Sequence, residues 1–221
     1  LTTDGCGSSV SSAGDFNGDG LGDLIIGAVG ANTEAGNSYV IYGTNSNPSS
    51  ISLISLTPNQ GFTITGAIAD DRSGQSVSSA GDFNGDGLSD VIIGAPDANS
   101  GAGNSYVIYG TSSQPSSLSL SSLTRKQGFA ITGAAVNDES GWSVSSAGDF
   151  NGDGLSDVII GAPGNYYASS EVGKSYVIYG ALAHSPASTS MMTSGGIGTS
   201  TTIPTSRMTS TNPPTYPVST T

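Results

Sequence analysis

A repeat of 67 residues constrains the fold of this chain more than any other feature of its sequence. The string Ser-Val-Ser-Ser-Ala-Gly-Asp-Phe-Asn-Gly-Asp-Gly-Leu occurs three times, and its first aspartate is Asp15, Asp82 or Asp149. Further words return with the same period, among them Asp-Val-Ile-Ile-Gly-Ala-Pro beginning at Asp90 and Asp157. A fixed period of this length is typical of an array in which each unit buries its apolar faces only against its neighbours.

The repeat offers four short segments with the composition of strands, and the third unit has the first three of them. The first three are Ser-Val-Ser-Ser-Ala, Val-Ile-Ile-Gly-Ala or its Leu-Ile-Ile-Gly-Ala counterpart, and Tyr-Val-Ile-Tyr; the fourth is Phe-Thr-Ile-Thr or Phe-Ala-Ile-Thr. Such β-branched and aromatic runs, bounded by Gly, Pro, Asn or Ser, are typical of strands separated by turns. Four antiparallel strands per long repeat are typical of one β-propeller blade, so we expect an all-β fold. The alternative, a β-solenoid, has coils much shorter than this period.

The repeat sets the expected domain boundaries. We expect a repeat region over residues 1–180, with units at 4–66, 70–133 and 137–180. The third unit ends after its Tyr-Val-Ile-Tyr segment, which predicts eleven strands rather than twelve. Propellers usually close with about four to eight blades. Three units therefore predict a partial or incomplete propeller: a fragment, an open array, or a chain that self-associates or uses further blades to close the ring.

The character of the sequence changes at residues 181–221. This segment is rich in Ser, Thr and Pro, contains no Asp or Glu, and has Arg207 as its only fixed charge. A segment of this kind buries too little apolar surface to offset the entropy lost on ordering. We therefore predict a disordered tail, either a plain linker or a mucin-like stalk.

Charge and composition exclude several classes of function. The formal net charge is −12, whereas nucleic acids and anionic membrane surfaces are bound by basic patches. No apolar run reaches the roughly 18 residues of a membrane-spanning helix. The single cysteine, Cys6, and the single histidine, His184, can form neither a disulfide framework nor a structural zinc site. We expect no nucleic-acid partner and no direct membrane insertion of this segment.

A loop between the first and second strands of every unit carries a metal-binding pattern. Its sequence is Asp-Phe-Asn-Gly-Asp-Gly-Leu-x-Asp, with side-chain oxygens at positions 1, 3, 5 and 9 and a glycine at position 6 for a sharp turn. Alternating oxygen ligands, completed by a backbone carbonyl at position 7, suit Ca²⁺. We therefore predict about three calcium ions, one per unit. The predicted ligands are Asp15, Asn17, Asp19, Leu21 and Asp23; Asp82, Asn84, Asp86, Leu88 and Asp90; and Asp149, Asn151, Asp153, Leu155 and Asp157.

Other interpretations of this loop fit less well. An EF-hand requires Glu at position 12, where this chain has Ile26, Ile93 or Ile160 inside an expected strand. Magnesium retains several waters, for which a loop donating about six oxygens leaves little room. Three Ca²⁺ would change the net charge from −12 to about −6 and relieve repulsion among these aspartates. A plain turn rich in Asp, Asn and Gly is the remaining alternative, and three intact copies argue against it.

At these residues the units resemble FG-GAP repeats, the blades of the integrin alpha-chain β-propeller. The aspartate loop followed by Gly-Ala-Pro, as at Gly94–Pro96 and Gly161–Pro163, is similar to the calcium-binding hairpin and signature of that family. Gly27–Val29 departs from the signature, and the family's Phe-Gly pair reads Cys-Gly or Ser-Gly here. The resemblance implies a calcium-stabilised propeller, usually of seven blades. It also implies an extracellular or cell-surface location and a role in adhesion or ligand recognition.

Three functions remain open at this point. The first is a non-catalytic calcium-binding module with an extracellular protein or glycan ligand, whose recognition loops would be among residues 32–37, 97–104 and 164–173. The second is an accessory propeller part of a larger secreted enzyme, in a phospholipase D-like context. The third is a self-assembling structural array.

Catalysis within the chain itself is not expected. Cys6 has no His or Asn partner in its unit, and no Gly-x-Ser-x-Gly motif or phosphate loop occurs. The acidic pairs Asp70–Asp71 and Asp138–Glu139 are expected to be solvated turns. Trp142 is expected to pack inward against a neighbouring blade.

Overall fold

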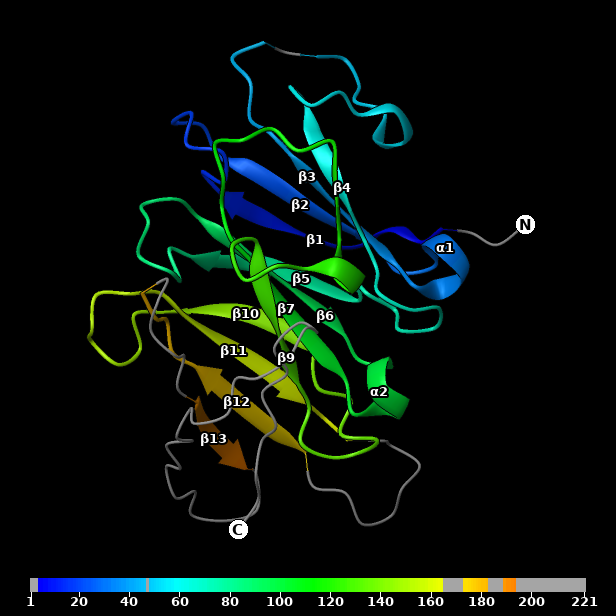
Figure 1. Cartoon of the computed structure of the whole chain (residues 1–221), viewed down its shortest axis with the longest axis vertical. Coiled ribbons are helices and arrows are strands. Elements are labelled where there is room, and N and C mark those ends of the chain that lie inside the picture. The colour runs from blue at the N-terminus through cyan, green and yellow to red at the C-terminus, as the bar shows by residue number, and fades with distance from the viewer. Residues whose placement is uncertain (1–3, 47, 165–172, 183–188, 194–221) are drawn as a thin grey trace.

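The structure is a computed structural model in which residues 4–46, 48–164, 173–182 and 189–193 are described. Its strands form three sheets that follow one another along the long axis of the molecule in chain order (Figure 1). The stack is open, because its two end sheets do not meet. The expected all-β architecture of propeller blades in an incomplete ring is confirmed.

Each sheet contains a four-stranded antiparallel meander built from one repeat unit. The expected strand words fall within strands, except that the last tyrosine of each Tyr-Val-Ile-Tyr word follows the strand end. The register places their apolar side chains in rows. Ser11 pairs with Ile25, Ile25 with Val40, and Val40 with Phe62. The strands are β1 (Cys6–Gly14), β2 (Asp23–Ala28), β3 (Asn37–Ile41) and β4 (Gly61–Thr65); β5 (Ser76–Gly81), β6 (Asp90–Ala95), β7 (Asn104–Ile108) and β9 (Gly128–Thr132); and β10 (Ser143–Gly148), β11 (Asp157–Ala162), β12 (Lys174–Ile178) and β13 (Thr189–Thr193).

The third sheet corrects the expected strand count. β13 pairs with β12 from Lys174–Thr193 to Ile178–Thr189, so the third unit has four strands rather than three. Five residues of the segment assigned to the tail thus belong to a sheet. Without β13, the edge of β12 would leave backbone N–H and C=O groups unpaired, and any extended segment can pair with them through its own backbone. The fourth strand therefore needs no particular sequence. The remainder of the predicted disordered tail, apart from residues 181–182, lies outside the described residues.

A fifth strand in the first sheet was not predicted. β8 (Ser117–Ser119) belongs to the second unit but pairs in parallel with β4, from Thr63–Ser117 to Thr65–Ser119. It is followed by the 3₁₀ turn η2 (Leu120–Ser122); the first unit has its counterpart η1 (Leu53–Ser55). A strand of three residues has too little periodicity to be seen in the sequence.

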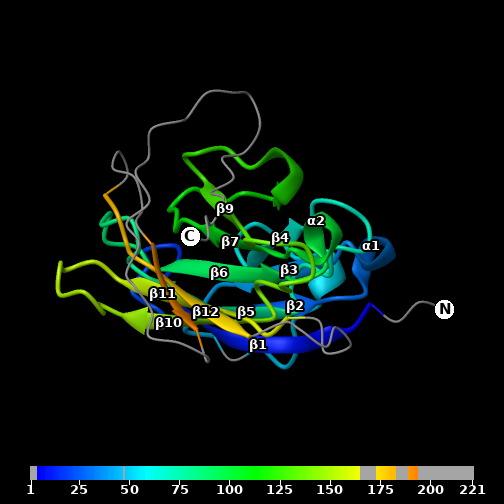
Figure 2. The same cartoon turned by 90° about the horizontal axis from the view of Figure 1, so that it is seen from below.

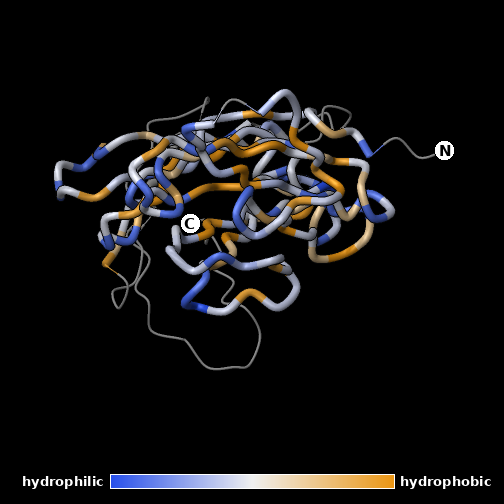
Figure 3. The backbone as a smooth tube through the Cα atoms, turned by 90° about the horizontal axis from the view of Figure 1, so that it is seen from above, coloured by the Kyte–Doolittle hydropathy of each residue, from blue (hydrophilic) through white to orange (hydrophobic). Residues whose placement is uncertain are grey.

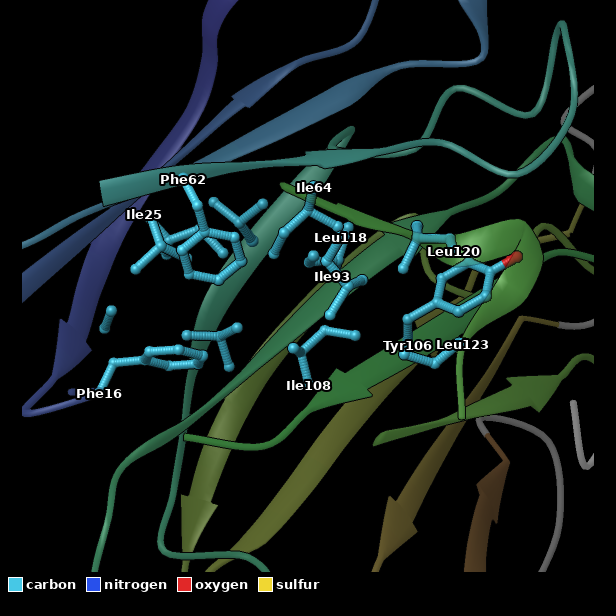
Figure 4. Packing of buried hydrophobic residues seen from close by; sticks show 14 of the residues in the cluster. Phe16, Ile25, Phe62, Ile64, Ile93, Tyr106, Ile108, Leu118, Leu120 and Leu123 are labelled. Carbon is cyan, nitrogen blue, oxygen red and sulfur yellow. The ribbon is translucent and has the colours of Figure 1, made fainter. Parts of the chain in front are cut away.

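Two apolar cores hold the sheets together. The first lies between the first and second sheets, where Phe16, Phe62 and Ile25 face Ile93 and Ile108 (Figure 4). The second lies between the second and third sheets. The same ring contact recurs in both: Phe16 and Phe62 have centroids 5.7 Å apart, as do their counterparts one repeat later. The apolar stretches accordingly run along strands inside the stack (Figure 3).

The first strands of the three units, β1, β5 and β10, come close to one another. β1, β5 and β10 lie side by side along one side of the molecule, with β9 at the other (Figure 2). Gly94 of β6 lies against the backbone carbonyl of Gly141 in the next unit, and a Cβ there would meet that oxygen. Gly27 has the same relation to Gly74. The glycine of the Gly-Ala-Pro signature is therefore required because a neighbouring backbone occupies the space of a side chain.

We predict that Gly94→Ala separates the second and third sheets and lowers the free energy of unfolding by about 1–3 kcal/mol, the usual effect of overpacking. Gly161→Ala is the matched control in the third unit. Its Cβ would closely approach only the Ser143 hydroxyl, which can rotate away, so we expect less than about half of that loss. Urea unfolding at low micromolar protein concentration measures both. Equal losses would contradict the assignment of Gly94 to a blade junction.

Candidate calcium site

The aspartate loops are the hairpins β1–β2, β5–β6 and β10–β11. Because each sheet is a meander, these hairpins lie at one end of the strands, while α1 (Ala31–Glu34) and α2 (Ala98–Gly101) lie at the opposite end (Figure 1). The glycine at position 6 has a left-handed backbone in all three hairpins, with φ of 85° at Gly20, 88° at Gly87 and 90° at Gly154. Only glycine adopts this conformation without strain, as the sequence pattern predicted.

The first aspartate closes the turn. In the first hairpin, Asp15 Oδ1 accepts from the amides of Gly18 and Asp19 at 2.8 and 3.0 Å, and Asp15 Oδ2 accepts from the amide of Gly20 at 2.9 Å. The bonds from positions 5 and 6 recur within 0.1 Å in the other two hairpins. The position-1 carboxylate therefore folds the backbone around itself in every unit.

Positions 3 and 5 converge on the same point. The Asp19 amide donates to Asn17 Oδ1 at 2.9 Å as well as to Asp15, so both side-chain oxygens lie within hydrogen-bond reach of one nitrogen. Asn17 Nδ2 donates to Asp19 Oδ2 at 3.0 Å. Leu21 joins this group through its amide, which donates to Asp19 Oδ1 at 2.8 Å. The structure thus gathers positions 1, 3 and 5 into one polar cluster at each hairpin tip; the counterparts are Asp82, Asn84, Asp86 and Leu88, and Asp149, Asn151, Asp153 and Leu155.

The position-9 aspartate lies beneath this cluster. Asp23, Asp90 and Asp157 are buried, with 1%, 0% and 0% of their surface exposed. In the second unit, Asp90 Oδ2 accepts from the amides of Phe83 and Asn84 at 2.9 and 3.3 Å, and Oδ1 accepts from Gly110 at 2.8 Å. This carboxylate joins the hairpin to the end of the third strand. Sequence reasoning assigned it only to a metal and missed its bond to the glycine that follows each Tyr-Val-Ile-Tyr word.

The chemistry of the cluster suits a hard cation. Carboxylate and amide oxygens dominate it, and no nitrogen or sulfur ligand is among the predicted residues. As the side chains stand, the described residues include no group of three or more His, Cys, Asp or Glu placed to hold a metal. The reason is visible in the hydrogen bonds: the carboxylates are turned onto backbone amides. A bound cation would have to share or replace those contacts.

Burial makes the position-9 charge costly. Desolvation is the main cause that raises the pKa of Asp90 to about 7; its backbone hydrogen bonds lower it, and the nearby charges of Asp86 and Asp82 raise it. Desolvation likewise raises the pKa of Asp23, again against its backbone hydrogen bonds. The ionised form is therefore disfavoured in the folded protein, and a nearby positive charge would favour it.

Backbone hydrogen bonds connect the first and second hairpins to the blade that follows each of them. The amides of Ser89 and Thr111 donate to the carbonyls of Asp15 and Phe16 at 3.0 and 2.9 Å. One repeat later, the amides of Ser156 and Ala181 donate to Asp82 and Phe83 at 3.1 and 3.0 Å. The three hairpins thus form a connected series. No sequence signal identifies these donors, because each acts through its main chain.

The opposite end of the strands carries different chemistry. In α1 and α2, Asn32, Thr33, Asn99 and Ser100 have left-handed backbones. Arg72 Nε lies 3.2 Å from Glu34 and 3.3 Å from Asp97, linking the loops of two units; all three side chains are partly exposed. Of the loops expected to vary, residues 165–172 lie outside the described residues.

Two expectations about this end are wrong. Of the acidic pairs expected in solvated turns, Asp70 is exposed, but Asp71 and Asp138 are only 7% and 5% exposed. Their turns hydrogen-bond to the segments that contain α1 and α2. Asp138 forms a 2.7 Å ion pair with Lys174. Trp142, expected to pack inward, is 46% exposed, because it precedes β10 and so lies at the end of the sheet rather than on its face.

The repeated four-stranded sheet with an aspartate hairpin at one end defines a β-propeller repeat protein. Residues 7–41, 73–108 and 140–178 match the FG-GAP repeat, each covering the first three strands of one unit. The chain therefore belongs to the FG-GAP repeat proteins.

Relatives of known type share this region. The chain is 35% identical to the phosphatidylinositol-glycan-specific phospholipase D of Mus musculus over 162 residues, which is 70% of this chain and 18% of the relative. It is 32% identical to integrin alpha-PS5 of Drosophila melanogaster over 158 residues, 69% of this chain and 14% of the relative. It is 36% identical to integrin alpha-M of Mus musculus over 97 residues, which is 42% of this chain and 8% of the relative. The chain thus spans less than a fifth of the length of these relatives. Within the described residues, none of the helices is long and apolar enough to cross a membrane.

We predict that Asp90→Ala, measured in excess chelator, lowers the free energy of unfolding by about 2–4 kcal/mol. The substitution leaves the buried amides of Phe83, Asn84 and Gly110 without their acceptor, and each unsatisfied buried donor costs about 1–3 kcal/mol, partly offset by removal of a buried charge. The control Asp86→Ala removes an exposed acceptor and should cost less than about 1 kcal/mol under the same conditions. Urea unfolding compares the two, and a similar loss for both would refute the bracing role of Asp90.

Proposed function

We propose that this chain is a calcium-binding, non-catalytic β-propeller module of an extracellular or cell-surface protein, which serves adhesion or the recognition of a protein or glycan ligand. One observation carries the proposal. The same set of oxygen-bearing side chains is built three times at the same end of the array, with matching hydrogen bonds each time. A plain turn needs no such set of carboxylates.

Each hairpin would hold one calcium ion. The candidate ligands are the side chains at positions 1, 3, 5 and 9 and the carbonyl at position 7: in the first hairpin Asp15, Asn17, Asp19, Asp23 and Leu21. When bound, the ion would supply positive charge to a site that holds three aspartates. That charge would offset both the repulsion among the carboxylates and the burial of the position-9 group.

The position of the hairpins indicates what calcium would do for the fold. In every hairpin except the last, two backbone carbonyls accept hydrogen bonds from amides of the next blade. A hairpin held rigid by an ion would hold those carbonyls in place, so calcium would stiffen the junctions between blades as well as the turns. We infer a structural rather than a chemical role for the ion.

We assign ligand recognition to the end of the strands that lies opposite the hairpins. The hairpins are committed to the metal and to neighbouring blades, whereas the α1 and α2 turns are bounded by strands and partly exposed. Thr33 and Ser100 have φ of 58° and 60°, which is strained for side chains of this kind. Strained loops on a rigid sheet scaffold are common at binding sites.

A second candidate function rests on one comparison. The phospholipase D relatives match the chain over 70% of its length at up to 35% identity. The module could therefore belong to a larger secreted enzyme as its accessory propeller. Its calcium sites would be the same in both cases.

The proposal is tested by thermal unfolding of the chain with Ca²⁺ titrated from excess chelator to millimolar concentration. Ligands that bind only the folded state stabilise it by mass action, about 2.7 kcal/mol at one hundred times the dissociation constant. We expect the unfolding midpoint to rise by several degrees, and calorimetry to count about three ions per chain. Mg²⁺ at the same concentration should raise the midpoint less.

The matched variant is the triple substitution of Asp19, Asp86 and Asp153 by Ala. These side chains are exposed, so the variant should fold in chelator and lose the response to Ca²⁺. The triple Asp4, Asp70 and Asp97 to Ala removes the same charge elsewhere and should keep the response. An unchanged midpoint in the wild type on adding Ca²⁺ would reduce the hairpins to turns and overturn the proposal.

Recognition is tested on an array of glycans and extracellular-matrix proteins probed with the fluorescent chain. We expect binding that is lost when residues 98–101 are replaced by Gly-Ser-Gly-Ser, and retained when the largely exposed residues 113–116 are replaced in the same way. Equal binding by both variants would exclude the α2 turn from the recognition surface.

A further inference from the structure

The two ends of the stack expose positions that are buried inside it. On the first sheet, Val10 and Leu24 are 68% and 53% exposed, whereas their counterparts one repeat later, Val77 and Val91, are 6% and 0% exposed. The second sheet uses those two positions to pack against the first. The outer face of the first sheet therefore lacks the neighbour that its own repeat pattern anticipates.

The third sheet shows the complementary exposure. Phe150 is 55% exposed, whereas its counterparts Phe16 and Phe83 are 0% and 1% exposed and belong to the cores between sheets. Ile159 is likewise only partly buried, while its counterpart Ile92 is fully buried. The third sheet thus presents outward the face that the first and second sheets pack against a following blade.

Each internal junction also contains the same three hydrogen bonds. In the first, Ser89 and Thr111 amides donate to hairpin carbonyls of the preceding unit, and the Ser9 hydroxyl donates to the Gly74 carbonyl at 2.8 Å. In the second junction the corresponding hydroxyl bond runs from Ser76 to Gly141, also at 2.8 Å. The junction is therefore a repeated and specific interface.

The ends carry separated halves of this interface. The counterparts of the amide donors are Gly22 and Thr44 on the first sheet. The counterparts of the acceptors are the Asp149 and Phe150 carbonyls on the third sheet, where Ser143 supplies the hydroxyl. No hydrogen bond within the described part of the chain engages these five groups. The amide donors of the first sheet thus correspond to the carbonyl acceptors of the third. Both ends also expose apolar side chains whose counterparts meet at an internal junction.

We propose that the first sheet of one copy packs against the third sheet of a second copy of this chain, at both junctions, to close a ring of six blades. A second copy fits because every chain carries both halves of the interface, and a closed two-fold arrangement leaves neither end open. Six blades lie within the usual range of about four to eight. Repulsion between two chains of charge −12 opposes this association. Ca²⁺ bound as in the proposed function would reduce that charge, so the association should then become stronger.

Light scattering after size-exclusion chromatography tests the proposal on the 221-residue chain, from 1 to 200 micromolar, in Ca²⁺ and in chelator. We expect the mass to rise from one chain to two and to stop there. Phe150→Ser at one end and Leu24→Ser at the other should each weaken the dimer at least tenfold. Ile68→Ser is the control, because Ile68 is 66% exposed on a connecting segment away from both faces. Far-UV circular dichroism checks that all variants fold.

Mixing the two end variants gives the decisive result. Alone, each variant lacks one half of both junctions; together, they retain one intact junction between the wild-type third sheet of one and the wild-type first sheet of the other. An equimolar mixture should therefore form a heterodimer at a concentration at which each variant by itself is monomeric. Gly161→Ala, outside the hairpin, provides a second third-sheet variant with the same expected behaviour.

Three outcomes would overturn the proposal. A wild-type chain that is monomeric at 200 micromolar both in Ca²⁺ and in chelator would show that the end faces are covered within the chain or need blades from elsewhere. Masses that increase without limit would show head-to-tail polymers rather than a closed ring. A dimer unaffected by either end variant would place the contact on another surface. None of these results depends on whether the hairpins bind Ca²⁺, because association is measured with and without it.

Discussion

The position-9 carboxylate under each hairpin is the interaction on which the rest of the structure depends. It accepts two amides from the hairpin and one from the end of the third strand, so a single side chain fixes the turn against the sheet. The carbonyls that reach the next blade belong to positions 1 and 2 of the same hairpin. Local turn geometry and blade-to-blade contact therefore depend on the same side chain, a carboxyl group held away from water.

The three repeats are nearly identical in sequence but not in environment. Phe83 is buried in the middle unit and Phe150 is exposed in the last, although the surrounding words are the same. The difference arises only from the presence or absence of a neighbouring sheet. Burial in such an array is set by position along the stack as much as by residue type, because each blade obtains its core from the blades beside it.

The strands that recur in the repeat, their order and the turn glycines could be predicted from the sequence, because they depend on periodicity and on local backbone conformation. The grouping of Asp15, Asn17 and Asp19 was equally predictable, since close sequence spacing fixes it. The burial of Asp71 and the pairing of Asp138 with Lys174 were not, because both depend on contacts between distant segments. β13 escaped prediction for a related reason: its pairing with β12 is made by backbone groups, which any sequence possesses.

The short strand β8 has a consequence for how the chain folds. It comes from the second unit but completes the outer edge of the first sheet beside β4, more than fifty residues earlier in the chain. The first blade can therefore acquire its full set of strands only after much of the second has emerged from the ribosome. The two blades should then unfold as one cooperative unit, while the third, which lacks such a crossing strand among its described residues, can open separately.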